Sequence, residues 1–261
     1  MGSPDAVEPD APARHGFAQA FARALPDADA TRAAVASGVA VAVFDLAPWR
    51  QHLDGADALI GPEAAARAGR QRLPAQRDAL RLAYALHRLV LAQALDCTPD
   101  AVGLFRDGKG CPRLPDDRLY TSLSHAGDRV AIAVSAIGPV GIDLEPAVRA
   151  LDMAELEERV AHPRERQALA ALPPALRGHA LLELWVRKEA LLKAAGIGLE
   201  LEMDVFEAPP DATLPLPGGR WQGRPVRLHS LACDEPWVMA MAAPPEAAPD
   251  TLYRPHPGGA D

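Results

Sequence analysis

The spacing of apolar and polar residues predicts a strand, a helix and a β-hairpin in the first half of the chain. Residues 39–44 form a short, continuous apolar run rich in β-branched side chains, which is typical of a buried strand. Residues 78–94 repeat apolar positions on one face at helical spacing. Residues 120–124 and 130–137 have the composition of strands, and Gly127 lies in the turn between them.

Two short segments of the second half match segments of the first half. Residues 142–146 line up with residues 44–48, and residues 238–242 line up with residues 130–134. A strand, helix and hairpin order that occurs twice predicts an α+β fold, built as a pseudo-two-fold repeat of two similar α/β halves. We expect the active site in the cleft between the halves, where ligand sites often lie.

The rest of the sequence predicts two further helices and the boundaries between the parts of the chain. Residues 152–160 predict a polar helix, and residues 180–194 predict a second helix that ends before Gly196. The expected division is a flexible N-terminal segment (1–36, with one short helix at 15–25), an N-terminal half (37–138), a C-terminal half (139–243) and a flexible tail (244–261).

Composition narrows the functional classes. The chain has 261 residues and no apolar run of eighteen, and its N-terminus lacks a basic segment followed by an apolar one, so we predict a cytoplasmic protein without a membrane span. Cys97, Cys111 and Cys233 are widely separated, which argues against a disulfide framework or a zinc site. A net charge of -8 argues against nucleic-acid binding.

Positive charge is concentrated in one segment. Residues 64–90 contain six arginines and one acidic residue, Asp78. Such a run is most often the solvated face of a helix. It would equally suit phosphate groups or an acidic partner protein, because guanidinium groups bind phosphate with two hydrogen bonds.

Two polar clusters suggest phosphate chemistry. In a strand, Asp143 and Glu145 point to the same face while their apolar neighbours point into the core. In a helix, Glu189 and Lys193 are four residues apart and lie side by side. Three carboxylates and one ammonium suit a magnesium ion and a phosphate, although each cluster alone is more often a solvated strand end or a surface ion pair.

Three segments together resemble a known family. Residues 140–145 read Val-Gly-Ile-Asp-Leu-Glu, residues 185–193 read Trp-Val-Arg-Lys-Glu-Ala-Leu-Leu-Lys, and residues 122–126 read Ser-Leu-Ser-His-Ala. In order and spacing they resemble the motifs of the 4'-phosphopantetheinyl transferases, in the larger single-chain type typified by the surfactin-synthetase activator. The likeness extends from about residue 39 to about residue 243.

The resemblance implies a reaction and its central residues. The 4'-phosphopantetheine arm of coenzyme A would be transferred to a serine of an apo acyl or peptidyl carrier protein, releasing 3',5'-ADP, by a monomeric, magnesium-dependent enzyme. Asp143, Glu145 and Glu189 would hold the magnesium ion, and Lys193 would contact the pyrophosphate. Only one metal site is expected, because the first half has Ala47 where the second has Glu145. Glu189 is the first candidate for the base that deprotonates the serine.

The resemblance also implies further contacts. Glu165 is the second candidate for the base, with a helix-start glutamate as the alternative, and Lys188 would either contact a phosphate or support the structure. Ser124 and His125 would hold the 3'-phosphate of coenzyme A. The family's Gly-Lys-Pro lysine would correspond either to Lys109, with an insertion before the proline, or to Cys111 in the lysine's place. Basic positions expected at the same phosphate are Arg70, Arg72 and Arg77.

Some residues depart from the family pattern, and other functions fit the same groups. Ser122 stands where the family has Asn, Ala126 where it has Ser or Thr, and Val186 where it has a small or hydroxylated residue. The alternative enzyme is a magnesium-dependent phosphohydrolase acting on coenzyme A or a related nucleotide. The non-enzymatic alternative is a carrier-protein-binding module whose arginine-rich helix attracts acidic partners.

Overall fold

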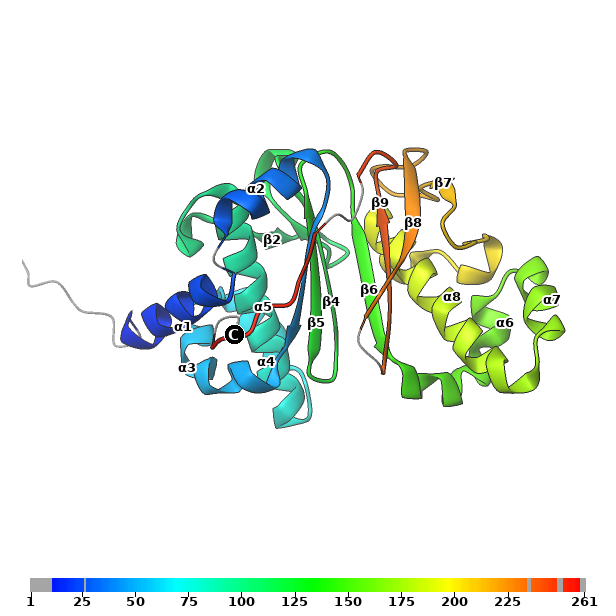
Figure 1. Ribbon diagram of the computed structural model, residues 1–261, viewed down its shortest axis with the longest axis horizontal. Helices are drawn as coiled ribbons and strands as arrows, with labels where there is room; N and C mark the ends of the chain where they lie inside the picture. The colour runs from blue at the N-terminus through cyan, green and yellow to red at the C-terminus, as the bar shows by residue number, and fades with distance from the viewer. Residues whose placement is uncertain (1–10, 26, 234–235, 248–250, 259–261) are drawn as a thin grey trace, which may run out of the picture.

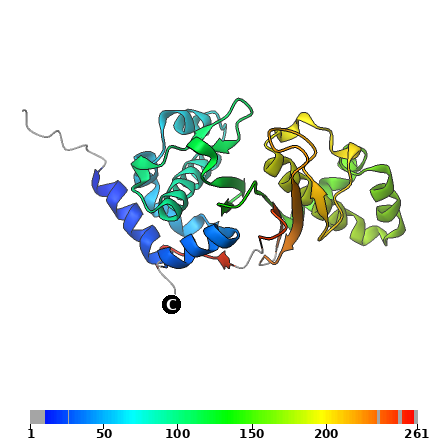
Figure 2. The same cartoon turned by 90° about the horizontal axis from the view of Figure 1, so that it is seen from above.

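Two four-stranded sheets face each other in the middle of the molecule, and helices cover the outer face of each (Figures 1 and 2). The computed structural model describes residues 11–25, 27–233, 236–247 and 251–258. A core of Val, Ala, Ile, Leu and Met side chains lies between the sheets, and a separate core lies under the helices of each half. This mixed helix and sheet architecture confirms the predicted α+β class.

The first sheet has the order β10-β1-β5-β4. Strand β1 (Ala40–Asp45) pairs antiparallel with β5 (Arg129–Ser135), and β5 pairs antiparallel with β4 (Tyr120–Ala126). The short strand β10 (Thr251–Tyr253) lies parallel to β1. Helix α5 (Pro74–Leu95) covers the outer face of this sheet.

The second sheet has the order β6-β9-β8-β7 and is antiparallel throughout. Its strands are β6 (Gly141–Pro146), β9 (Trp237–Ala243), β8 (Pro225–Leu231) and β7 (Thr213–Pro215). Helix α8 (Pro174–Ala195) covers the outer face, and it ends at Gly196, which has a positive φ of 68°.

Shorter elements complete the two halves. They are α1 (Ala11–Ala24), α2 (Ala28–Ser37), η1 (Ala47–His52), α3 (Leu53–Asp57), α4 (Pro62–Gly69), η2 (Pro99–Ala101), β2 (Phe105–Arg106), β3 (Pro112–Arg113), η3 (Pro115–Asp117), η4 (Ala147–Leu156), α6 (Glu157–Val160), α7 (Pro163–Ala171), η5 (Gly198–Glu200) and η6 (Met203–Val205), where η denotes a 3₁₀ helix.

Three sequence-based expectations need correction. The N-terminal segment is not generally flexible, because α1 buries Phe17 and Phe21 in the first core and α2 adds Val35, although residues 1–10 lie outside the described part. The tail contributes β10 to the first sheet, since backbone pairing with β1 satisfies an otherwise open edge. The polar helix predicted at 152–160 is mostly the 3₁₀ helix η4, followed by one turn of α-helix.

The edge strands β4 and β6 of the two sheets lie side by side and are joined through serine side chains. The amide of Ile142 donates to Oγ of Ser122 at 3.1 Å, and the amide of Leu144 donates to Oγ of Ser124 at 3.4 Å. Serine hydroxyl oxygens of β4 thus accept the hydrogen bonds that backbone carbonyl oxygens would accept between paired strands. Ser122, which departs from the family pattern, has this joining role.

Gly141 allows helix α8 to lie directly on β6. A Cβ atom at residue 141 would lie 1.9 Å from the carbonyl oxygen of Ala190 and 2.5 Å from the amide nitrogen of Ala194. Backbone atoms at these distances cannot move aside as a flexible side chain could, so only glycine fits. The close approach brings the face of α8 that carries Glu189 and Lys193 next to Asp143.

No helix in the described ranges combines the length and the apolar character that crossing a bilayer requires.

Candidate active site

A pocket of about 320 Å³ lies between the two halves, where β4, β6 and α8 meet. We call it the central pocket. Residues from all three motif segments (122–126, 140–145 and 185–193) line it. The other lining residues come mainly from α4, α5 and β2. The lining residues are Arg67, Tyr84, Arg106, Leu123, Ser124, His125, Asp143, Glu145, Trp185, Glu189 and Lys193.

Asp143 and Ser124, which are buried, and the half-buried Lys193 are joined at the floor of the central pocket. Oδ1 of Asp143 accepts hydrogen bonds from Nζ of Lys193 at 2.6 Å and from Oγ of Ser124 at 2.7 Å. The Lys193 ammonium also donates to Oγ of Ser124 and to the carbonyl of Ile142. Asp143 is only 4% exposed, so this contact lies largely out of water and connects β4, β6 and α8.

Two further carboxylates face the same space. Glu145 pairs with Arg149, whose guanidinium lies 4.5 Å from the ring centre of Trp185. Burial, and then repulsion by Asp143, raises the pKa of Glu145. The same causes in the same order raise the pKa of Glu189 to about 7. The predicted trio of carboxylates is therefore brought together, and its members repel one another.

The chemistry of these donors suits a hard cation. Oδ2 of Asp143 is buried and has no hydrogen-bond partner within the described residues, and an unpaired buried carboxylate oxygen is costly. Carboxylate oxygens are the ligands that magnesium prefers. No group of three or more His, Cys, Asp or Glu side chains in the described ranges is already arranged around one metal position; Lys193 and Arg149 instead neutralise two of the carboxylates.

Basic side chains also line the central pocket. His125 lies beside Ser124 at the end of β4, and its pKa is lowered first by desolvation and then by the charge of Lys193. Arg67 comes from α4 and Arg106 from β2. A polyphosphate in this pocket would meet the cationic groups of Lys193, Arg67 and Arg106.

Sequence reasoning did not assign Arg67 and Arg106 to the site. Arg67 belongs to the arginine-rich segment, whose charge indicated phosphate binding without selecting a residue. Arg106 stands outside that segment, and no motif marked it. Its guanidinium lies 4.8 Å from the ring centre of Tyr84 and donates to the carbonyl of Gly110 at 2.6 Å, so its place depends on the β2–β3 hairpin.

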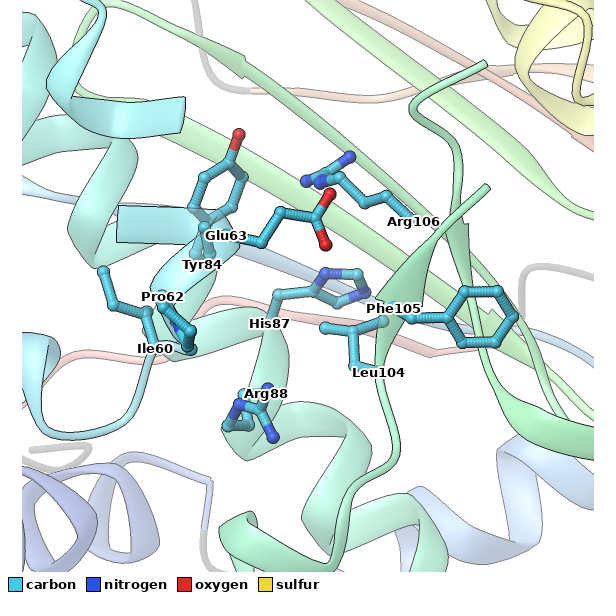
Figure 3. A pocket seen from close by; sticks show the side chains of 11 residues that line it. Ile60, Pro62, Glu63, Tyr84, His87, Arg88, Leu104, Phe105 and Arg106 are labelled. Carbon is cyan, nitrogen blue, oxygen red and sulfur yellow. The ribbon is translucent and has the colours of Figure 1, made fainter. Parts of the chain in front are cut away.

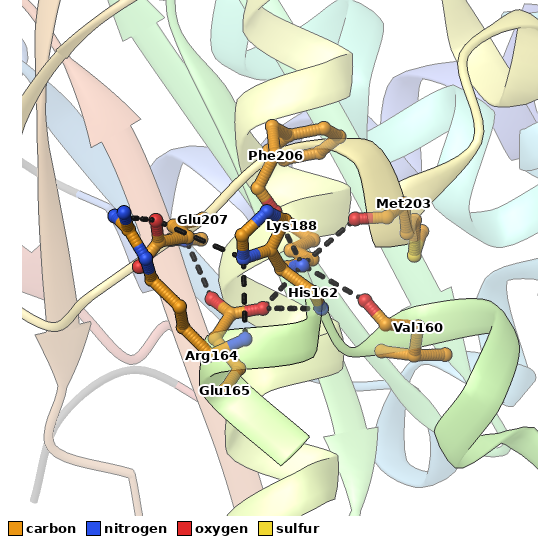
Figure 4. A network of polar contacts seen from close by, with 9 residues as sticks. Val160, His162, Arg164, Glu165, Lys188, Met203, Phe206 and Glu207 are labelled. Carbon is orange, nitrogen blue, oxygen red and sulfur yellow. Dashed lines mark hydrogen bonds and ion pairs between the residues drawn. The ribbon is translucent and has the colours of Figure 1, made fainter. Parts of the chain in front are cut away.

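Glu165 and Lys188 lie outside the central pocket and contact each other (Figure 4). Lys188 is fully buried, with Nζ 2.6 Å from Oε2 of Glu165, and it donates to the carbonyls of Val160, Met203 and Phe206. Glu165 also caps α7, where it accepts from the amide of His162. The geometry favours the alternative interpretation of both residues: Glu165 is a helix-start glutamate away from the central pocket, and Lys188 is held in a structural contact.

The other basic residues named from the sequence do not line the central pocket. Arg77 donates to the carbonyls of Gln71 and Arg72 and so holds the turn between α4 and α5. Lys109 pairs with Glu200. Arg70, Arg72, Arg77, Lys109 and Cys111 are all absent from the lining of the central pocket. The expectation that Arg70, Arg72 and Arg77 hold the 3'-phosphate is not supported by this geometry, because sequence spacing did not show which arginines turn inward.

Carboxylates and arginines from both halves face one pocket, and this combination suits phosphate chemistry. Comparison with known proteins identifies the family. Residues 139–242 match the family model of the 4'-phosphopantetheinyl transferase superfamily. The chain is 30% identical over 206 residues to the 4'-phosphopantetheinyl transferase HetI of Nostoc sp., covering 74% of this chain and 85% of that protein. The chain belongs to the 4'-phosphopantetheinyl transferases.

Two other relatives match over a shorter region. The 4'-phosphopantetheinyl transferase of Bacillus subtilis is 30% identical over 157 residues, covering 58% of this chain and 66% of the relative. A Synechocystis sp. protein, provisionally named as the same transferase, is 30% identical over 153 residues, covering 58% of this chain and 62% of the relative. The chain therefore spans slightly less than two thirds of the length of these two proteins.

The buried contact between Lys188 and Glu165 predicts a large effect on stability. Lys188→Met should lower the free energy of unfolding by about 3 kcal/mol or more, because a buried carboxylate loses its partner. Adding Glu165→Gln removes that unpaired charge and should restore part of the loss. Urea unfolding of the wild type and the two variants measures both effects. Unchanged stability with weakened coenzyme A binding would instead make Lys188 a ligand contact.

Proposed function

We propose that the chain transfers the 4'-phosphopantetheine arm of coenzyme A to a serine of an apo acyl or peptidyl carrier protein and releases 3',5'-ADP. The observation that carries this proposal is the meeting, in one pocket, of three carboxylates with the basic side chains of Lys193, His125, Arg67 and Arg106. A ligand that combines a pyrophosphate with a further phosphate would match this distribution of charge.

The reaction is a phosphoryl transfer, so positioning and charge neutralisation supply most of the catalysis. Lys193 contacts the pyrophosphate and stabilises the phosphate of the departing ADP. His125 and Arg67 hold the 3'-phosphate, and Ser124 keeps Lys193 in place through its hydroxyl. Arg106 adds a further cation to the same pocket.

Asp143, Glu145 and Glu189 would hold a magnesium ion. The buried, unpartnered oxygen of Asp143 and the mutual repulsion that raises the pKa values of Glu145 and Glu189 support this assignment. When bound, the ion would neutralise the negative charge of the pyrophosphate.

Glu189 is the proposed base that accepts the proton of the incoming serine hydroxyl. Burial, and then repulsion by Asp143, raise its pKa to about 7 in the protein without a cation, and a bound cation would favour the ionised form that can accept a proton. It stands on a rigid helix beside Lys193, so its carboxylate can face the reacting groups from a fixed position.

We further propose that the two halves (37–138 and 139–243) are copies of one unit and that the enzyme is a cytoplasmic monomer. The connection order supports the repeat: β1, α5 and the β4–β5 hairpin in one half correspond to β6, α8 and the β8–β9 hairpin in the other. In both sheets the first strand neighbours the second strand of the hairpin. A pocket formed by both halves of one chain needs no second subunit.

Incubation with coenzyme A, magnesium and several apo carrier proteins tests the transferase directly. We expect each accepted carrier to gain the mass of the phosphopantetheine arm on one serine, measured by intact-protein mass spectrometry. Release of 3',5'-ADP in the absence of any carrier protein would favour a phosphohydrolase. Formation of a stable complex with neither product would favour a binding module.

The metal assignment predicts weaker ion binding in Asp143→Asn. This change keeps a hydrogen-bonding oxygen beside Lys193 but removes the ligand charge, so Mn²⁺ affinity, measured by electron paramagnetic resonance, should fall at least about tenfold. Asp45→Asn is the matched control, because Asp45 has the equivalent strand position in the first half, where Ala47 replaces the glutamate. Equal Mn²⁺ affinity in wild type and Asp143→Asn would remove Asp143 from the metal site.

The phosphate assignment predicts a specific loss of discrimination. Each charge-assisted contact should contribute about 1.5 to 3 kcal/mol, roughly ten- to a hundredfold in affinity. Calorimetry should therefore show that the wild type binds coenzyme A more tightly than its analogue without the 3'-phosphate.

A double variant and a control locate that discrimination. His125→Ala combined with Arg67→Ala should bind both ligands with nearly equal affinity, because the partners of the phosphate are gone. Arg77→Ala should keep the wild-type preference, since Arg77 holds a turn. Loss of preference in Arg77→Ala alone would reverse this assignment.

A further inference from the structure

Two arginines lie over aromatic rings beside the central pocket, and they differ in their other partner. Arg106 lies over the ring of Tyr84, where the central pocket borders a second cavity of about 270 Å³ (Figure 3), and it donates to a backbone carbonyl. Arg149 lies over the ring of Trp185 and donates to Oε1 of Glu145. Of the two, Arg149 is the one that pairs with a proposed metal ligand.

The packing of η4 on α8 determines where Arg149 lies. A Cβ atom at residue 178 would lie 2.4 Å from the carbonyl oxygen of Ala150, so the helix and η4 are in direct backbone contact. Met153 of η4 is fully buried in the core of the second half. Arg149 precedes Ala150, and Trp185 follows residue 178 by about two turns of α8. Arg149 therefore connects the end of β6 to the helix that carries the other site residues.

The two cations that neutralise carboxylates of the site are held differently. Lys193 donates to Asp143, to a serine hydroxyl and to a backbone carbonyl. Within the described residues, Glu145 is the single hydrogen-bond partner of Arg149. The Arg149 side chain is 30% exposed, so water can solvate its guanidinium once the contact with Glu145 is broken. Arg149 is therefore the cation that can leave its carboxylate at the smaller cost.

The balance of charge indicates which cation a metal ion would replace. Three ionised carboxylates and Lys193 together carry two negative charges, which one divalent cation cancels. If Arg149 also stayed at Glu145, the site would hold an excess positive charge, and like charges repel strongly in a partly buried site. In the described ranges the three carboxylates do not surround one metal position, and Glu145 is turned to Arg149.

We propose that Arg149 is a positioning residue that stands in for the metal ion at Glu145, and that a divalent cation enters the site by displacing it. The guanidinium holds Glu145 beside Asp143 until the ion arrives. After displacement it keeps its place over Trp185, because the face of an indole ring attracts a cation. The inference rests on the magnesium site of the proposed function and adds to it how that site is loaded.

The test measures Mn²⁺ affinity by electron paramagnetic resonance in the absence of coenzyme A. Arg149→Met keeps an apolar side chain against Trp185 and removes the competing charge. Its Mn²⁺ affinity should exceed that of the wild type at least about tenfold, because no charge-assisted hydrogen bond has to be broken. Arg159→Met is the matched control. Arg159 is exposed on α6, so its loss should change the affinity by less than about twofold.

A double-mutant cycle separates displacement from simple repulsion through space. In a Glu145→Gln background, Arg149→Met should change the Mn²⁺ affinity by less than about twofold, because the carboxylate through which Arg149 acts is gone. A merely structural role of Arg149 would not depend on Glu145 in this way. Equal gains in the wild-type and Glu145→Gln backgrounds would overturn the proposal in favour of repulsion.

The remaining outcomes separate this inference from the proposed function. Unchanged or weaker Mn²⁺ binding by a folded Arg149→Met variant would overturn the displacement of Arg149, while the wild type still modifies carrier proteins. Absence of Mn²⁺ binding by the wild type and every variant would overturn the proposed metal site together with the inference. Circular dichroism of each variant verifies that the comparison is made between folded proteins.

Discussion

The buried contact of Asp143 with Lys193 and Ser124 is the interaction on which the arrangement of the site depends. It joins the edge strands of two separate sheets to the long helix of the second half. An ammonium and a carboxylate held largely out of water are stable only with matching geometry and additional hydrogen bonds, which Ser124 and the carbonyl of Ile142 supply. The same side chains thus hold the strands and the helix together and also line the pocket. A substitution at any of them is expected to affect both stability and activity.

Close backbone packing explains why this contact can form. Because residue 141 has no side chain, α8 approaches β6 until the Glu189 face of the helix borders the strand carboxylates. On the other side of the helix, Lys188 is fixed by three carbonyls and Glu165, so the orientation of α8 about its axis is defined from both sides. Adjacent residues of one motif, Lys188 and Glu189, therefore face opposite environments.

Which side chains share one face of a strand or helix was predicted correctly from the sequence. Contacts between segments that are distant in the sequence were not. Alternation along β6 predicted that Asp143 and Glu145 share a face, and helical spacing predicted the neighbouring Glu189 and Lys193; both follow from local geometry. Whether an arginine turns inward depends on tertiary packing, so the arginine-rich segment suggested Arg77 although Arg67 lines the pocket. Arg106 reaches the site through a two-residue strand in a hairpin, which leaves no periodic signal in the sequence.

The parallel pairing of β10 with β1 ties the two ends of the fold together. The first sheet gains its fourth strand only after the whole second half has been traversed, so the halves are interleaved along the chain although each has its own core. During synthesis, the edge of β1 therefore stays unpaired until the last strand, β10, has been made. A cut between the halves would therefore yield an N-terminal fragment with an exposed strand edge prone to pairing with other chains.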